Sequence, residues 1–502
     1  MATNPIRESL KSGKFFYMVE MVASGTAREA QVLQAASEIA MVPEITAGSV
    51  TSYAGGSSGH DPVRMGTAAR ARGITVNIHL TCVNKDRLTI HNTLQDLAAL
   101  GIENVFAISG DYPKGADPAS TVFDMDSVQL VEMINEVRQH AKIPFLISAA
   151  VSPFKYVEAD CAYQYLKLEK KIAAGADYAI TQLGYDSRKF RELKRYLDER
   201  GLKTPVLGNV YILNGRAAEK MSKGEPPGCW VAKELLERIQ EETKSADKGM
   251  AGRLERAAKM VAIVRGMGYA GAYLGGDSKA ERLKWVIKRS EELAPKWEEL
   301  AEEISYAPKG GFYFYETPKA PAKPRGFALA ASETMHSLLF AKQEPLKSLL
   351  TGVVKTIDHF PAAAHALERL EFAFKSPAYG CQACGNCVLP DMEYVCPQTC
   401  PKGMRNGPCG GTLMGRCEVH DMPCIWVEVY DRAKASNNIE QLKTFIPAPN
   451  RALKNTSSWI NYFLDRDVRP GHPGELIQIE PLPASLQPEP QAASTSTATN
   501  TK

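Results

Sequence analysis

Five polar residues lie within or directly after short apolar runs and are the first candidates for chemistry: Glu20, Thr46, His79, Asp111 and Gln182. A carboxylate is seldom buried without a partner or a role, and an apolar setting raises its pKa. We therefore expect Glu20 to act as a proton donor near neutral pH. Asp111 and Gln182 could then hydrogen-bond a polar heterocycle.

Each of these residues also has a purely structural interpretation. His79 could be a hydrogen-bonded core histidine, Thr46 could cap the segment that follows it, and Asp111 could be an ordinary turn residue. The set points to an active site only if the fold brings these residues together.

A second group of candidates consists of cysteines. Eight of the eleven lie close together: Cys381, Cys384, Cys387, Cys396, Cys400, Cys409, Cys417 and Cys424. The first three form a C-x2-C-x2-C run, a common iron–sulfur spacing, although zinc could also be bound. We expect a [4Fe–4S] cluster on the first three plus Cys396 or Cys400, with the others free to hold a second metal. A zinc-stapled fold without redox function is the alternative.

The elements that must position these residues are read from eight short, mostly apolar runs that alternate with helical patterns. These runs cover residues 15–23, 42–46, 75–81, 105–108, 144–151, 178–183, 205–213 and 271–276. The alternation predicts an α/β fold of the (β/α)8 type, in which chemistry sits where strands end. A doubly wound sheet is the alternative, but the glycine-rich fingerprint it needs after its first strand is missing at 23–26.

The chain divides into four parts on composition. We expect a barrel over residues 1–305, a linker rich in Pro, Lys and Gly over 306–330, and a helical and cysteine-rich metal-binding module over 331–470. The last part, 471–502, is rich in Pro, Gln, Ser and Thr and is expected to be disordered.

Composition excludes several classes of function. A length of 502 residues requires more than one core, and the net charge of +3 gives no indication of a nucleic-acid partner. No uncharged apolar run is long enough for a membrane span, and the N-terminal residues lack the apolar core of a signal peptide. Cysteines concentrated in one segment are more typical of metal ligation than of a secreted disulfide scaffold, which predicts a cytoplasmic protein.

Three stretches together resemble the methylenetetrahydrofolate reductase family, over roughly residues 15–290. They are His79-Leu-Thr-Cys82, the segment from Leu100 to Pro113 that ends in Ser109-Gly110-Asp111-Tyr-Pro, and the segment from Lys170 to Gln182. The second motif normally reads Arg-Gly-Asp in that family, so Ser109 stands in place of an arginine.

This resemblance implies a flavin-bearing barrel that reduces 5,10-methylenetetrahydrofolate to 5-methyltetrahydrofolate, or catalyses the reverse oxidation, with FAD carrying hydride. It implies that Glu20 is the general acid that helps to open the five-membered ring of the folate. It also implies that Asp111 lies near the pterin and the flavin and that Gln182 hydrogen-bonds the pterin. The positions that match FAD contacts in the family are Thr46, His79, Gly110, Asp111 and Lys171.

The segments 401–411 and 415–418 resemble a C-terminal module found in some of these reductases, which in acetogens is a separate small subunit associated with an iron–sulfur cluster. This implies that electrons enter from a ferredoxin-like protein through the cluster. NAD(P)H is the alternative donor. Family members are often oligomeric, so a homo-oligomer is implied. Two alternatives stay open: a folate-dependent methyltransferase and a non-catalytic subunit that docks a redox partner.

Overall fold

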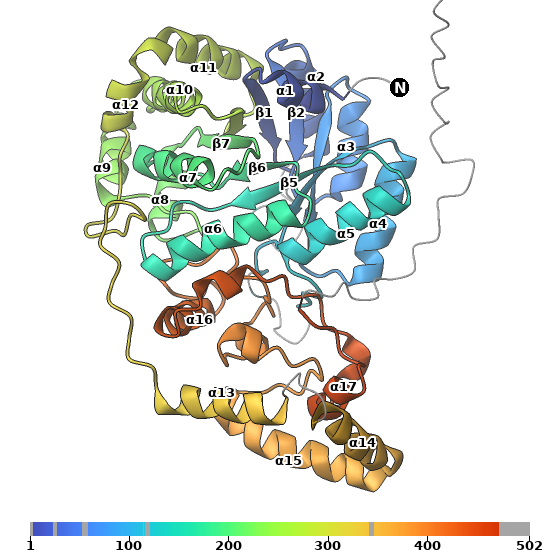
Figure 1. Ribbon diagram of the computed structural model, residues 1–502. Helices are drawn as coiled ribbons and strands as arrows, with labels where there is room; N and C mark the ends of the chain where they lie inside the picture. The colour runs from blue at the N-terminus through green and yellow to red at the C-terminus, as the bar shows by residue number, and fades with distance from the viewer. Residues whose placement is uncertain are drawn as a thin grey trace, which may run out of the picture.

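The computed structural model describes residues 4–23, 28–52, 59–113, 115, 121–340 and 346–470. Eight parallel strands close into a barrel in which each strand pairs with its neighbours in the sequence, and β8 pairs back with β1 (Figure 1). The strands are β1 (Phe16–Met21), β2 (Ile45–Val50), β3 (Val76–Thr81), β4 (Asn104–Ile108), β5 (Leu146–Val151), β6 (Tyr178–Thr181), β7 (Val206–Tyr211) and β8 (Gly271–Gly275). The predicted (β/α)8 barrel is confirmed.

Helices connect the strands and surround the barrel. Aspartates accept backbone N–H hydrogen bonds at the starts of several of them, as Asp86, Asp126 and Asp186 do. The helices of this part are α1 (Pro5–Ser12), α2 (Glu29–Ala40), α3 (Pro62–Arg70), α4 (Arg87–Ala99), α5 (Ser127–His140), α6 (Glu158–Ala173), α7 (Ser187–Glu199), α8 (Gly215–Ser222), α9 (Lys233–Glu242), α10 (Met250–Gly266), α11 (Ala280–Leu293) and α12 (Trp297–Glu303).

Strand β2 differs from the sequence prediction, which placed a strand at residues 42–46. The observed strand begins at Ile45 and continues to Val50 through small residues of low intrinsic strand preference. Pairing with β1 and β3 makes this segment a strand, and close packing requires small residues in it: a Cβ at Gly48 would lie 2.4 Å from the sulfur of Met21. The neighbouring strand β1 therefore determines the position of β2 more than the apolar pattern of β2 itself.

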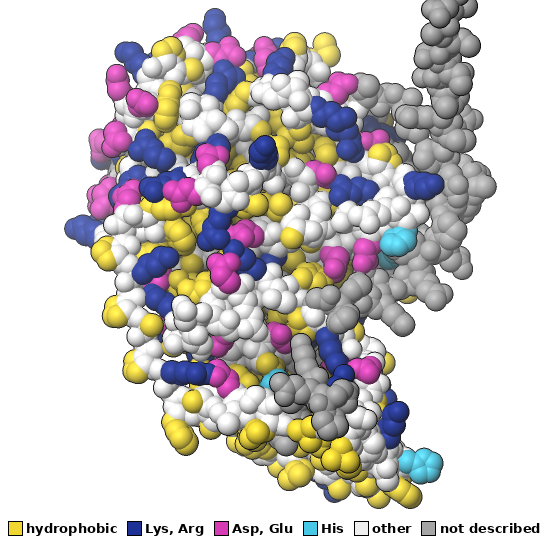
Figure 2. All heavy atoms as spheres, in the orientation of Figure 1, with side chains coloured by type: hydrophobic (Ala, Val, Ile, Leu, Met, Phe, Trp, Pro, Cys, Tyr) yellow, Lys and Arg dark blue, Asp and Glu magenta, His cyan; other side chains and the backbone are white. Residues whose placement is uncertain are grey.

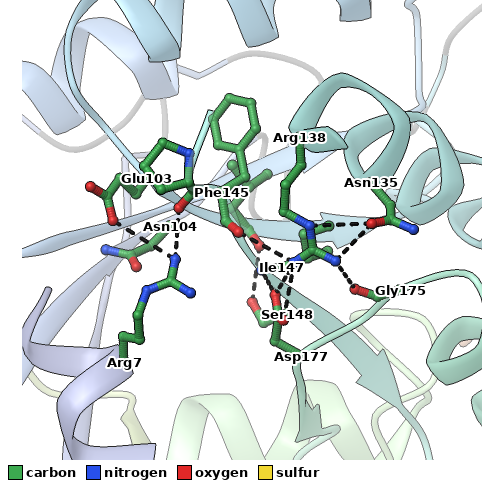
Figure 3. Close-up of polar contacts among 12 residues, drawn as sticks. Arg7, Glu103, Asn104, Asn135, Arg138, Phe145, Ile147, Ser148, Gly175 and Asp177 are labelled. Atoms are coloured by element: carbon green, nitrogen blue, oxygen red, sulfur yellow. Dashed lines mark hydrogen bonds and ion pairs between the residues drawn. The ribbon is translucent and has the colours of Figure 1, made fainter. Parts of the chain in front are cut away.

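A charged network ties the elements together at the amino end of the strands (Figure 3). Arg138 of α5 donates to Asp177 at 2.8 Å, to the carbonyl of Gly175 at 3.1 Å and to Asn135 at 2.7 Å. Asp177 in turn accepts the backbone N–H of Ile147 at 2.7 Å. One guanidinium thus links α5, β5 and the turn before β6.

The C-terminal residues form a second layer against the barrel (Figure 1). The helical part of the module expected over 331–470 begins with three helices, the third of which starts at Pro361. The helices of this part are α13 (Phe327–Leu339), α14 (Leu346–His359), α15 (Pro361–Tyr379), α16 (Ile425–Ala435) and α17 (Ser458–Phe463). Helix α16 packs on α6, where Tyr163 and Leu166 share an apolar cluster with Met404, Trp426 and Val429.

The segment expected to be a linker begins on the barrel surface. Phe312 and Tyr313 are buried, and the Tyr313 hydroxyl donates to Asp186 at 2.7 Å. Residues 318–327 are exposed. The tail expected over 471–502 lies outside the described residues. None of the described helices combines the length and the apolar character needed to cross a membrane.

The Arg138 network gives a stability prediction. Replacing Arg138 with Met should lower the free energy of unfolding of the barrel by about 2 kcal/mol, because hydrogen bonds to a charged group are lost and Asp177 keeps a partly buried charge. Urea denaturation followed by circular dichroism measures this.

A matched control is Lys223→Met, which removes an exposed ion pair with Glu219 and should change stability by less than about 0.5 kcal/mol. Equal effects of the two substitutions would contradict the structural role of Arg138.

Candidate functional site

A cavity of about 410 Å³ lies at the carboxyl ends of the barrel strands, which is within the usual size range for a ligand site. It brings together most of the residues that the sequence selected. Those that line it are Glu20, His79, Gly110, Asp111, Lys171 and Gln182.

Thr46 does not line this cavity, contrary to the sequence prediction. Glu20 on β1 is paired in register with Ser49, so Thr46 lies three residues nearer the amino end of β2. The residues that β2 contributes are instead Thr51 and Ser52, directly after the strand. They were missed because the expected strand at 42–46 ended too early.

Glu20 lies in the barrel interior because successive side chains of a strand alternate between its two faces. It therefore shares a face with Phe16 and Met18, which pack in the barrel core. Burial raises the pKa of its carboxyl group from the ordinary 4.5 to about 7. Gly275 on β8 leaves room for this group, since a Cβ there would lie 3.0 Å from the Glu20 oxygen.

His79 is both a core residue and a pocket residue. Its Nε2 atom lies 3.0 Å from the Ser49 hydroxyl and 3.3 Å from the Tyr273 hydroxyl, and its ring packs edge-on against Phe106. Burial lowers the pKa of His79 to about 3. The imidazole is therefore neutral at physiological pH and can act as a hydrogen-bonding group but not as an acid.

The turn after β4 presents Asp111 to the pocket. Gly110 has a φ of +83°, and a Cβ at this position would lie 2.7 Å from Val83, so the turn requires glycine. Asp111 is open to solvent on the pocket side. Enclosure by protein on its other sides raises its pKa, and the nearby Lys402 opposes that shift.

Lys171 of α6 is a buried cation in the pocket wall. Its Nζ donates to the carbonyl of Ala150 at 2.6 Å. Burial, together with the neighbouring Lys167, lowers its pKa to about 7. A small change in its surroundings, such as a bound anion, would therefore change its charge near neutral pH.

The C-terminal layer closes one side of the same cavity, which the sequence did not predict. Its contributions are Lys402, Pro408, Cys409, Gly410, Gly411 and Glu418. Buried lysines from the barrel hold this segment by its backbone: Lys155 donates to the Gly410 carbonyl at 2.8 Å, and Lys167 to the Pro408 carbonyl at 2.9 Å. The only sequence signal was an excess of lysines around α6, a pattern that normally indicates a solvated face.

Two uncharged buried polar atoms in the pocket wall have no hydrogen-bond partner among the described residues. They are the Ser152 hydroxyl and the side-chain carbonyl of Asn209. Buried polar groups are normally paired, so atoms of this kind indicate where a polar ligand binds. A ligand with several hydrogen-bonding groups would supply the partners that these two atoms lack.

The eight clustered cysteines fall into two groups of four. Cys381, Cys384, Cys387 and Cys396 line one small cavity, whereas Cys400, Cys409, Cys417 and Cys424 line another. Within the described ranges, no three His, Cys, Asp or Glu side chains are arranged so that they could hold a metal ion as they stand. The donor chemistry of each group fits a thiolate-bound metal, but the metal site expected from the sequence is not established.

Arg405 lies beside the first group. It is 1% exposed, and its Nε and Nη1 atoms have no hydrogen-bond partner among the described residues. Burial lowers the pKa of its guanidinium, and the thiols of Cys384, Cys387 and Cys396 oppose that shift. A buried cation requires a counter-charge, which the Asp126 carboxylate provides in part and thiolates would complete.

The raised pKa of Glu20 makes a prediction for stability. The folded protein holds the Glu20 proton up to about pH 7 and the unfolded chain only to about 4.5, so wild type loses stability as pH rises through that window. Glu20→Gln cannot lose a proton, so above pH 7 it should be more stable than wild type by at most about 3 kcal/mol.

Urea unfolding of both proteins at about pH 4.5 and about pH 8 tests this, since the difference should nearly vanish at the lower pH. If the free energy of unfolding of wild type equals or exceeds that of the variant at the higher pH, Glu20 is ionised in the folded protein without loss of stability.

Comparisons with known proteins agree with this site. The chain matches the family model described as methylenetetrahydrofolate reductase over residues 5–268, and the one described as methylene-tetrahydrofolate reductase C terminal over residues 360–452. It is 30% identical over 159 residues to the 5,10-methylenetetrahydrofolate reductase of Pectobacterium carotovorum subsp. carotovorum, covering 31% of this chain and 50% of that protein.

A second relative is the probable methylenetetrahydrofolate reductase (NADPH) of Caenorhabditis elegans, 26% identical over 161 residues, or 31% of this chain and 24% of that protein. The aligned region thus spans half or less of these relatives. The first family model, however, covers more than half of this chain and includes seven of the eight strands and every pocket residue that they supply. The chain therefore belongs to the methylenetetrahydrofolate reductase family.

Proposed function

We propose that the protein is a flavin-dependent oxidoreductase that interconverts 5,10-methylenetetrahydrofolate and 5-methyltetrahydrofolate. The observation that carries this proposal is the Glu20 carboxyl group, which has a pKa of about 7 and lies in the pocket at the carboxyl end of the barrel. Membership of the reductase family supports the reaction type. The position of Glu20 supports its role as the acid.

Glu20 would deliver a proton to a ring nitrogen of the folate. Opening the five-membered ring requires a better leaving nitrogen, and protonation by a neutral carboxyl group lowers that barrier. A carboxyl group with a pKa near 7 is about half protonated at neutral pH, so it can both give and recover the proton. Asp111 and Gln182 would hydrogen-bond the pterin and hold it in the pocket.

The same pocket would hold FAD. His79, Gly110 and Lys171 line it from β3, the turn after β4 and α6, and the unpaired atoms of Ser152 and Asn209 suit a ligand with many polar edges. FAD would supply the hydride chemistry, while the protein positions it and sets its electrostatic surroundings. The neutral imidazole of His79 and the backbone at Gly110 would orient it.

Electrons would enter through the cysteine-rich layer. We propose a [4Fe–4S] cluster on Cys381, Cys384, Cys387 and Cys396, which share one cavity, and a second metal, iron or zinc, on the other four cysteines. The buried charge of Arg405 supports thiolates in the first group. Cys409 lines both the second cysteine cavity and the barrel pocket, so a centre there that contains iron would lie beside the flavin and would pass on electrons from a ferredoxin-like donor.

The proposed role of Glu20 predicts a kinetic effect. Glu20→Gln should lower the turnover of 5-methyltetrahydrofolate oxidation by a factor of about 100 to 10,000, because in this direction the Glu20 carboxylate must accept the proton released when the ring closes and an amide cannot, while bound flavin stays at the wild-type level. Anaerobic assays with an artificial electron acceptor, with absorption spectra of both proteins, measure the two quantities.

The matched control is Glu44→Gln, an exposed glutamate directly before β2 at the opposite end of the barrel, which should leave turnover unchanged. Wild-type protein without flavin that transfers methyl groups to a corrinoid protein would identify a methyltransferase instead. Wild-type protein without either activity would identify a docking subunit.

The division of the cysteines predicts separate metal losses. Cys396→Ser should lose the iron and sulfide of the first group and keep the metal of the second, whereas Cys400→Ser should do the reverse. Iron, zinc and sulfide analysis with electron paramagnetic resonance of anaerobically purified protein measures both.

The control is Cys82→Ala, which changes a buried cysteine outside both groups and should keep all metal. If Cys400→Ser empties the first centre and Cys396→Ser leaves it full, the proposed ligand set is wrong.

A further inference from the structure

Lys402 is a basic residue of the C-terminal layer that lines the barrel pocket. Its side chain is 2% exposed and forms an ion pair with Glu418, which is equally buried. Its Nζ donates to the carbonyl of Gly110 at 2.9 Å. Lys402 thus contacts the turn that carries Asp111, although 291 residues separate it from that residue in the chain.

The charge of Lys402 matters because the three residues directly after β4 include a carboxylate and no basic side chain. The residues there are Ser109, Gly110 and Asp111. The other two lysines that line the pocket come from α6 and donate to backbone carbonyls elsewhere: Lys167 to Gly407 and Pro408 of the C-terminal layer, and Lys171 to Ala150 of β5. Lys402 is therefore the pocket lysine that contacts the turn after β4.

The ammonium group of Lys402 has capacity for a ligand. It carries three N–H donors, and the carbonyl of Gly110 and the carboxylate of Glu418 account for two of them. A donor that is charged and shielded from water forms a stronger hydrogen bond than a neutral one. A carbonyl oxygen or an anionic ring nitrogen of a bound heterocycle is the kind of group that it would hold.

We propose that Lys402 is a cofactor-binding residue that the C-terminal layer supplies to the barrel, where it stabilises negative charge on a flat heterocycle bound beside Asp111. This inference rests on the proposed function, because it requires a flavin or a pterin in the pocket. A fixed cation in a water-poor site favours the more negative state of a ligand, here its reduced form. The barrel alone would then be an incomplete site.

Removing the charge of Glu418 should have the opposite effect to removing the charge of Lys402, which provides a second test. Lys402 and Glu418 face each other in the wall shared by the pocket and the second cysteine cavity. Removing the lysine makes the wall more negative, and removing the carboxylate makes it more positive. A residue with only a structural role would not shift a bound redox group in opposite directions in the two variants.

The experiment uses the full-length protein purified without oxygen, as wild type, Lys402→Met, Lys402→Arg and Glu418→Gln. Lys402→Met should weaken FAD binding about tenfold or more, measured by fluorescence quenching, and lower the midpoint potential of bound flavin. Lys402→Arg should retain most of both properties. Glu418→Gln should raise the midpoint potential.

The matched control is Lys454→Met, which removes an exposed lysine of the same layer and should leave both quantities unchanged. If Lys402→Met is unstable, the other two variants still decide the question. The midpoint potential of bound flavin should rise in Glu418→Gln and stay close to the wild-type value in Lys402→Arg. Unchanged FAD affinity and potential in Lys402→Met, or equal losses in Lys402→Met and Lys402→Arg, would overturn the inference. Wild-type protein that binds neither FAD nor 5-methyltetrahydrofolate would overturn the proposed function, and this inference with it.

Discussion

Buried hydrogen bonds between the barrel and the backbone of residues 405–415 hold the C-terminal layer over the mouth of the barrel. Asp126 accepts the backbone N–H groups of Arg405 at 3.1 Å and Asn406 at 2.9 Å, and Asp160 accepts that of Gly415 at 2.8 Å. Lys155 and Lys167 donate to carbonyls of the same segment. Each buried backbone group without such a partner would cost about 1–3 kcal/mol, so this irregular segment is buried only because the barrel supplies partners for it.

This arrangement makes the pocket a product of both parts of the chain. The strands bring in Glu20 and His79, whose pKa values are shifted in opposite directions by the same cause, burial. Near physiological pH, His79 is therefore neutral and can act as a hydrogen-bonding group, whereas Glu20 is about half protonated and can act as an acid. The C-terminal layer adds a buried ion pair and places Cys409 in the wall between the pocket and the second group of cysteines.

The sequence predicted the barrel well because local patterns encode it: seven of the eight strands fall where the apolar runs placed them. The prediction placed β2 too early, at 42–46, because close packing against Met21 requires small residues there and leaves little apolar pattern to detect. For the same reason it selected Thr46, which does not line the pocket. Spacing alone left the fourth cysteine open between Cys396 and Cys400, and the fold groups Cys396 with the first three. The position of Lys402 in the pocket wall could not be predicted from the sequence, because it depends on contacts between segments almost 300 residues apart.

The most direct test of the account is a single-turnover experiment on the intact protein. Wild-type protein purified without oxygen, with its flavin oxidised, is mixed with 5-methyltetrahydrofolate while absorbance is recorded. The account predicts that the oxidised-flavin absorbance decreases and that 5,10-methylenetetrahydrofolate forms in equal amount, because the folate and the flavin share one pocket. Protein that carries flavin but shows no change on mixing, or that carries no flavin at all, would contradict it.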